Sequence, residues 1–174
     1  MSVALQEHGF KCFLKIFEKS MALLRCFKKQ YGVSERKEIT MRDENCIFCK
    51  IAAGEIPSAT LYEDDDFRVI LDIEPASKGH ALILPKEHYA NLYELDDELA
   101  SKALVLAKKM ITKLTDILGC DGYNVLQNNG PVAGQTVFHF HMHLIPRYKE
   151  DDVKIGWKMG KLTEEVREEI LEKI

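Results

Sequence analysis

The most regular alternation of polar and apolar positions in the chain lies in residues 134–147. Three histidines occupy every second position there, with apolar side chains between them: His139, Phe140, His141, Met142, His143 and Leu144. Successive side chains of a β-strand point to opposite faces of a sheet. If this run is a strand, the three imidazoles share one face at intervals of about 7 Å, and the apolar side chains bury the other face in a core.

The remaining pattern predicts four further strands and three helices. Runs of β-forming residues bounded by turn residues indicate strands at residues 60–63, 67–73, 80–85 and 122–127. A long amphipathic helix begins after Asp96, next to further acidic residues, and ends at Gly119, because these residue types stabilise the two ends of a helix. A short helix precedes Gly54, and Thr163 begins a C-terminal helix.

Residues 1–43 differ from the rest, and we expect them to form an extension in front of a domain that spans residues 44–174. Apolar residues recur at spacings of three and four over residues 4–30, which predicts an amphipathic helix. Residues 1–40 carry a net charge of +4, which leaves −8 for the remainder. We favour a helix that packs on the core or on a partner subunit over one that rests on an anionic membrane. Alternatively, Met41 is the natural start.

Composition narrows the possible classes of protein. A chain of 174 residues is long enough to bury one domain core. Its net charge of −4 does not favour broad nucleic-acid binding, and no apolar run has the length of a membrane span. Five irregularly spaced cysteines without a signal peptide favour a reducing, cytoplasmic location over a disulfide framework.

Cys46 and Cys49 form a C-x-x-C pair. Two cysteines at this spacing hold a metal ion or form a redox dithiol. They are also compatible with two small buried apolar residues. The pair alone does not decide between these interpretations.

The alternating histidines have two functional interpretations. Imidazoles on one face of a strand bind a metal, or one neutral imidazole attacks an electrophile while another orients it or moves a proton. A chance arrangement on an exposed strand is the remaining alternative. The preceding loop offers backbone N–H groups near Gly130 and Gly134 for an anion. No carboxylate lies within six residues of the row, and this favours phosphate chemistry.

Six collinear motifs carry a resemblance to a known family: Cys46-Ile47-Phe48-Cys49-Lys50-Ile51, Gly54-Glu55-Ile56-Pro57, Leu71-Asp72-Ile73, Lys78-Gly79-His80, Pro85-Lys86-Glu87-His88 and His139-Phe140-His141-Met142-His143-Leu144-Ile145. Over residues 44–149 the chain resembles the histidine triad (HIT) superfamily, and most of all its Hint-type and bacterial HIT members. The resemblance implies an α+β fold with a five-stranded antiparallel sheet, one long helix and a homodimer.

The resemblance also implies an enzyme that hydrolyses or transfers nucleoside monophosphates. Its typical substrates are adenosine phosphoramidates, aminoacyl adenylates and dinucleoside polyphosphates. His141 matches the nucleophile, which forms a nucleotidyl-histidine intermediate that water resolves. His143 matches the residue that contacts the phosphate and assists the leaving group, Thr136 matches a donor to the leaving group, and His80 matches a histidine that supports the nucleophile.

Further residues match contacts to a purine nucleotide. Asp72 matches the carboxylate that binds the ribose hydroxyls. The side chains of Asn128 and Gln135, with the backbone N–H of Val137, match phosphate contacts. The base slot corresponds to four apolar residues: Ile47, Phe48, Ile51 and Ile73. Such a slot tolerates several bases, with adenine favoured. Arg147 stands either near a second phosphate or as a solvated strand end.

Some bacterial members carry one zinc ion, and this chain has all four matching ligands: Cys46, Cys49, His88 and His139. Two thiolates and two imidazoles form a closed tetrahedral set, so we expect one structural zinc per subunit. Two alternatives stay open, a zinc-dependent hydrolase that uses the histidine row as ligands and a non-catalytic nucleotide sensor or scaffold.

Overall fold

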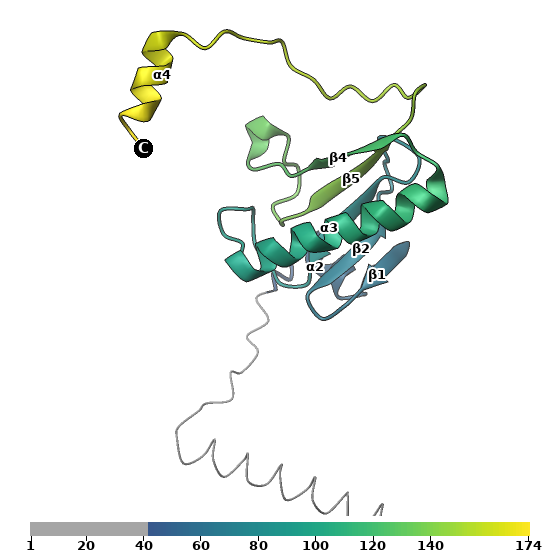
Figure 1. The fold of residues 1–174 in the computed structure, drawn as a ribbon. Helices are drawn as coiled ribbons and strands as arrows, with labels where there is room; N and C mark the ends of the chain where they lie inside the picture. The colour runs from purple at the N-terminus through teal and green to yellow at the C-terminus, as the bar shows by residue number, and fades with distance from the viewer. Residues whose placement is uncertain (1–41) are drawn as a thin grey trace, which may run out of the picture. The chain divides into compact units, whose positions relative to one another are not determined.

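The computed structural model describes residues 42–174 (Figure 1). The predicted amphipathic helix over residues 4–30 lies outside this range. The described elements follow in the order α2 (Ile47–Ala52), β1 (Thr60–Glu63), β2 (Phe67–Leu71), β3 (Ala81–Pro85), α3 (Asp97–Leu118), β4 (Gly122–Leu126), the 3-10 turn η1 (Pro131–Ala133), β5 (Met142–Arg147) and α4 (Glu164–Leu171).

All five strands form one antiparallel sheet in the order β1-β2-β3-β5-β4. The four strands predicted outside the histidine row and the α+β class are confirmed. In the register, His143 of β5 lies opposite Leu82 of β3 on one side and Leu126 of β4 on the other. Because paired residues of adjacent strands share a face, this register fixes the side of the sheet that His143 occupies.

The predicted strand over the whole histidine row is wrong. β5 begins only at Met142, so His139 and His141 precede it. The backbone N–H of Phe140 donates to the carbonyl of Tyr89 at 2.6 Å, which ties this segment to the loop after β3. The first two histidines of the row therefore lie in a segment outside the sheet, and only His143 lies in the strand.

Helix α3 covers one face of the sheet (Figure 1). The helix begins where predicted, and the Asp96 carboxylate accepts the N–H groups of Glu98 and Leu99 and caps the first turn. Gly119 ends the helix in the left-handed conformation at φ 62°. The buried side chains of α3 are Ala103, Leu106, Ala107, Met110 and Leu114. They pack on Val69, Ile83, Phe140, Met142 and Leu144 in the main core.

Helix α2 lies against the opposite face. Phe48 and Ile51 pack there on the buried side chains of Ile70, Leu82 and Leu84. Since Leu82 is paired with His143, this face also carries the last histidine of the row. Helix α3 thus packs on one face of the sheet, while helix α2 and His143 lie on the other face.

Residues beyond Asp151 contain the predicted C-terminal helix α4, whose first turn is capped by the Thr163 hydroxyl. Among residues 42–174 no helix is both long and apolar enough to cross a membrane.

Gly79 holds the loop before β3 against the end of α3. Its φ is +87°, and a Cβ atom there would lie 2.4 Å from Leu118 Cδ1. Gly79→Ala adds a backbone penalty of about 1–2 kcal/mol and a packing penalty of about 1 kcal/mol or more. Gly119→Ala is the matched control, because its φ is +62° with no atom within 4 Å. Urea unfolding measures both, and an equal loss in the two variants contradicts the predicted close packing.

Candidate active site and metal centre

Five of the chain's six histidines lie in one array of rings on the α2 face of the sheet. Neighbouring ring centroids along it are 4.9 to 6.0 Å apart in the order His88, His139, Phe48, His141, His143 and His80. The rings come from α2, from the loops that flank β3, from β5 and from the segment before β5. Segments far apart in sequence therefore build a single site.

His139 is fully buried. Its Nε2–H donates to the carbonyl of Pro85 at 3.0 Å, so its Nδ1 carries the lone pair. That atom lies 3.6 Å from Cys46 Sγ and 3.4 Å from Cys49 Sγ. Burial, before all other causes, lowers the pKa of His139 to about 4. Its imidazole is thus a neutral ligand aimed at two thiols.

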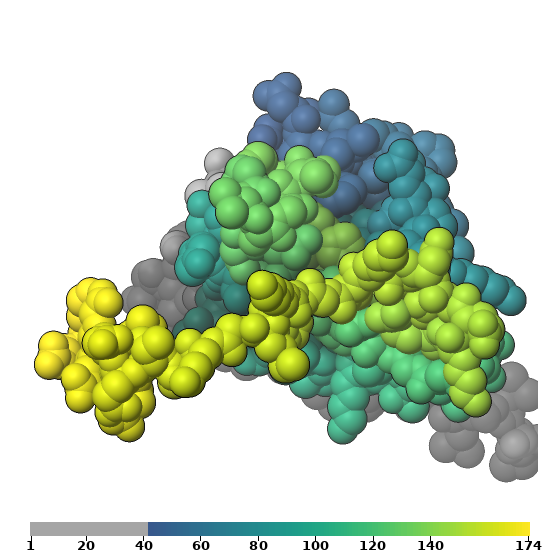
Figure 2. All heavy atoms as spheres, turned by 90° about the horizontal axis from the view of Figure 1, so that it is seen from above, coloured from purple at the N-terminus to yellow at the C-terminus, as the bar shows by residue number. Residues whose placement is uncertain are grey.

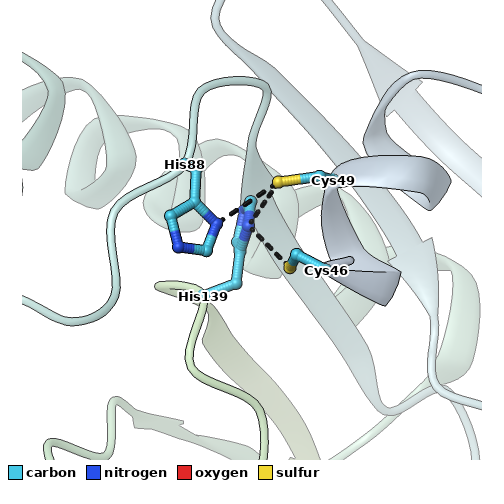
Figure 3. Close-up of side chains that lie close together, drawn as sticks. All are labelled: Cys46, Cys49, His88 and His139. Atoms are coloured by element: carbon cyan, nitrogen blue, oxygen red, sulfur yellow. Dashed lines mark hydrogen bonds between the residues drawn. The ribbon is translucent and has the colours of Figure 1, made fainter. Parts of the chain in front are cut away.

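His88 completes this group from the loop after β3 (Figure 3). Its Nδ1 lies 3.3 Å from Cys49 Sγ, and all four ligand atoms lie within 4.8 Å of one another. A tetrahedral zinc ion, with its usual bond lengths to sulfur and nitrogen, separates these two kinds of ligand by about 3.6 Å. The measured sulfur–nitrogen distances fit a zinc ion, and the hydrogen bond from His139 to Pro85 is the kind of support that orients a histidine ligand.

His141 carries its proton on the other ring nitrogen than His139. Its Nδ1–H donates to the backbone carbonyl of His139 at 2.7 Å, which leaves the lone pair on Nε2. The side chain is buried, and burial is the main cause that lowers its pKa below the usual value. A neutral imidazole with a free Nε2 is a nucleophile near neutral pH.

A chain of hydrogen bonds fixes the tautomer of His143. The N–H of Ala76 donates to His80 Nδ1 at 3.1 Å, so the proton of the neutral His80 ring is on Nε2. That group lies 3.0 Å from His143 Nδ1 and donates to it. His143 consequently presents an Nε2–H, and burial lowers its pKa to about 4.

The structure therefore brings His80 into direct contact with His143, not with the His141 ring. Asp72 lies beside this pair, with its Oδ2 3.6 Å from His80 Nδ1. Its other oxygen accepts the N–H of Glu74 at 2.9 Å. Sequence reasoning missed the role of Ala76, because a backbone N–H leaves no signal in the residue type.

The four residues expected to line a base slot differ in their burial and in their packing on the sheet. Phe48 has its ring edge-on to His141, with centroids 5.1 Å apart, and Ile51 packs beside it. Ile47 is half exposed, whereas Ile73 is 94 % exposed. Phe48 and Ile51 are the members of this set that pack on the sheet next to the nucleophile candidate.

The loop before β5 is shaped by Gln135, which is 3 % exposed. Its Oε1 accepts the N–H of Gly130 at 2.8 Å, and its amide donates to Ala90 O at 2.6 Å and Val137 O at 3.0 Å. These bonds fix the loop internally. Thr136 next to it is exposed, and the loop stands out at the surface around η1 (Figure 2).

Two more predicted polar residues take part in internal bonds. Asn128 makes a long hydrogen bond of 3.5 Å to Gly134 O. Arg147 donates to both carboxylate oxygens of Asp151 at 2.8 and 2.7 Å and to Asn124 Oδ1 at 2.7 Å. The Arg147 guanidinium is thereby held by hydrogen bonds at the end of the sheet. Asp151, which sequence reasoning missed, follows Arg147 at the i,i+4 spacing.

Known proteins share much of the sequence of this domain. The HIT domain family matches residues 53–150. The chain is 51 % identical to Protein hit of Bacillus subtilis, over 66 % of this chain and 80 % of that protein. It is 46 % identical to the adenosine 5'-monophosphoramidase hnt1 of Schizosaccharomyces pombe, over 75 % of this chain and 98 % of that protein.

A solved structure extends the similarity to three dimensions. The Zn-bound histidine triad family protein from Mycobacterium smegmatis superposes with a TM-score of 0.61 at 35 % identity, over 66 % of this chain and 83 % of that one. The fold, the histidine row and the sequence matches lead to one conclusion: the chain belongs to the HIT superfamily, as a Hit/Hint-type protein.

Proposed function

We propose that the protein is a nucleotide hydrolase or transferase that cleaves a nucleoside monophosphate from its substrate through a covalent intermediate on His141. The observation that carries this proposal is the hydrogen bond from His141 Nδ1–H to His139 O at 2.7 Å. It leaves the Nε2 lone pair free, on a buried ring whose pKa is lowered. These are the properties of an imidazole nucleophile.

In the proposed reaction, His141 Nε2 attacks the α-phosphorus and the bond to the leaving group breaks. The His143 ring lies 4.9 Å from the His141 ring, and its Nε2–H is a donor to the phosphate or the leaving group. Thr136 is a second donor to the leaving group. Water then attacks the phosphorus and releases the nucleoside monophosphate from His141.

The substrate that we propose is an adenosine phosphoramidate. The similar yeast protein is named as an adenosine 5'-monophosphoramidase. Phe48 and Ile51 form an apolar slot beside His141, and such a slot specifies base edges weakly. Asp72 is the proposed partner of the ribose hydroxyls. The commitment of Arg147 to Asp151 weakens the case for a second phosphate site and thus for dinucleoside polyphosphates.

Phosphate contacts by Asn128 and the Val137 N–H are part of the same proposal, and Gln135 contributes to them through the loop. The internal bonds of the Gln135 amide support a share for this residue in shaping the loop. In that case Gln135 acts by presenting the neighbouring N–H groups to the phosphate.

We further propose one structural zinc ion held by Cys46, Cys49, His88 and His139. Four protein ligands leave no position for water, so the ion stabilises the fold and takes no part in the reaction. This argues against the zinc-dependent hydrolase. Among the described residues the cysteines are free thiols, which supports a cytoplasmic location.

Finally, we propose a homodimer. Helix α3 leaves apolar side chains in solvent on its outer side, with Leu104 63 % and Ile117 66 % exposed. Strand β4 is an edge strand, and edge strands pair readily with another chain. A two-fold contact through α3 and β4 covers both features.

His141→Ala removes the proposed nucleophile. Release of AMP from an adenosine phosphoramidate should fall at least about 10³-fold in kcat/KM, with an unchanged circular dichroism spectrum. Rapid acid or base quenching of the wild type, followed by mass spectrometry, should find a nucleotidyl group on the peptide that contains His141. Full turnover in the variant contradicts the assignment, and tight AMP binding by a wild type without turnover supports the sensor alternative.

Zinc removal separates a structural from a catalytic metal. Cys46→Ser should lose the ion and lower the thermal unfolding midpoint, because the metal no longer links α2 to the rest of the fold. The fraction that remains folded should keep its turnover. Cys120→Ser is the control, since Cys120 is also buried but lies outside the ligand cluster. A folded, metal-free and inactive protein would instead favour the zinc hydrolase.

Leu104→Glu places a charge in the proposed dimer contact and should yield a monomer, because an unpaired charge there has to be buried. Sedimentation velocity measures the change. Ile170→Glu in α4, where Ile170 is 50 % exposed, is the matched control and should remain dimeric. The interface lies elsewhere if the control dissociates and Leu104→Glu does not.

A further inference from the structure

Glu63, Arg68 and Lys86 form an ion-pair network that connects β1, β2 and the residue after β3. Glu63, at the end of β1, contacts Arg68 Nη2 at 2.7 Å and Lys86 Nζ at 2.9 Å through its two carboxylate oxygens. Arg68 lies opposite Glu63 in the register of β1 and β2, and Lys86 follows β3 directly. One carboxylate thus ties together three segments of the chain.

The Arg68 arm of this network holds helix α2. Arg68 Nη1 donates to the carbonyl of Ile51 at 2.8 Å, in the last turn of the helix. A Cβ atom on Gly54 would lie 3.3 Å from both terminal guanidinium nitrogens, so the guanidinium packs closely over the residues that end the helix. A cation in this position stabilises the free carbonyls of a helix C-terminus.

Helix α2 depends on such support. It has only six residues and no side-chain hydrogen bond at its N-cap, which is Cys46 itself. A helix of this length is unstable without tertiary contacts. Because Cys46 and Cys49 are its N-cap and a residue of its first turn, the position of α2 determines where both sulfur ligands lie.

The Lys86 arm holds the histidine half of the ligand cluster. Lys86 stands between Pro85, whose carbonyl orients the His139 ring at 3.0 Å, and the ligand candidate His88. Its backbone N–H also donates to Asp66 O at 2.8 Å. Fixing Lys86 at both its side chain and its backbone therefore constrains the segment that sets both imidazoles.

We infer that Arg68, Glu63 and Lys86 are positioning residues for the metal centre, which hold the cysteine half and the histidine half at ligand distance. None of the three touches a ligand atom in the described contacts; they act through α2 and through residues 85–88. The inference rests on the zinc site proposed above. It assigns to an ion-pair network on the sheet a share of the metal affinity, because ligands held in place before binding lose less entropy on binding.

The test uses the full chain loaded with Zn²⁺ and compares Glu63→Gln and Arg68→Lys with Glu98→Gln. The control removes a similar carboxylate, since Glu98 pairs with Lys102 at 2.9 Å on α3. Arg68→Lys keeps the charge but loses the fork that reaches Ile51 O and Glu63 together. Competition with a chromophoric chelator should show about fivefold weaker zinc binding in both test variants. The zinc affinity of the control should equal that of the wild type.

A second measurement separates positioning from general stability. The rise in thermal midpoint on adding Zn²⁺ should shrink in Glu63→Gln and Arg68→Lys, and the Co²⁺-substituted forms should show altered visible bands. If both variants bind zinc as tightly as Glu98→Gln, with the same gain in midpoint, the inference is wrong while the zinc site stands. If the wild type itself binds no Zn²⁺, the zinc proposal and the inference are both overturned.

Discussion

The hydrogen bond from His139 to the carbonyl of Pro85 is the contact on which both parts of the site depend. It places the proton of this ring on Nε2 and turns Nδ1 toward the thiols of Cys46 and Cys49. The same residue offers its own carbonyl to His141. A single buried residue thereby sets one ligand atom of the proposed metal site and the tautomer of the proposed nucleophile.

His80 and His143 are oriented by a second chain of hydrogen bonds, which also begins at a backbone group. A backbone N–H from Ala76 determines where His80 carries its proton, and His80 determines the same for His143. Burial keeps these rings neutral, since it lowers the pKa of each. The site therefore contains a lone pair on His141 and a donor on His143 side by side.

Much of this arrangement could be predicted from local sequence signals. Asp96-Asp97-Glu98 and Gly119 mark the ends of α3 because the chemistry of helix ends is local, and the four strands outside the histidine row follow from runs of β-forming residues. The four ligands of the cluster and the family follow from motifs whose residue types and spacing are specific.

Local sequence signals could not show that the three histidines do not share one face of a single strand. The break in the row depends on the bond between Phe140 N–H and Tyr89 O, which joins backbone atoms 51 residues apart in the sequence. Gln135 is similar, because its type suggests a ligand contact while its bonds to Gly130, Ala90 and Val137 depend on the folded loop. Ile73 matches a motif position, yet it is 94 % exposed.

The separation of the cluster residues along the chain has a consequence for the order of folding. Cys46 and His139 are 93 residues apart, and Cys49 and His88 are 39 apart. Closing such long loops costs entropy that only the assembled sheet repays. During synthesis both thiols leave the ribosome long before their last partner, so the proposed zinc site can be completed only after the sheet has formed.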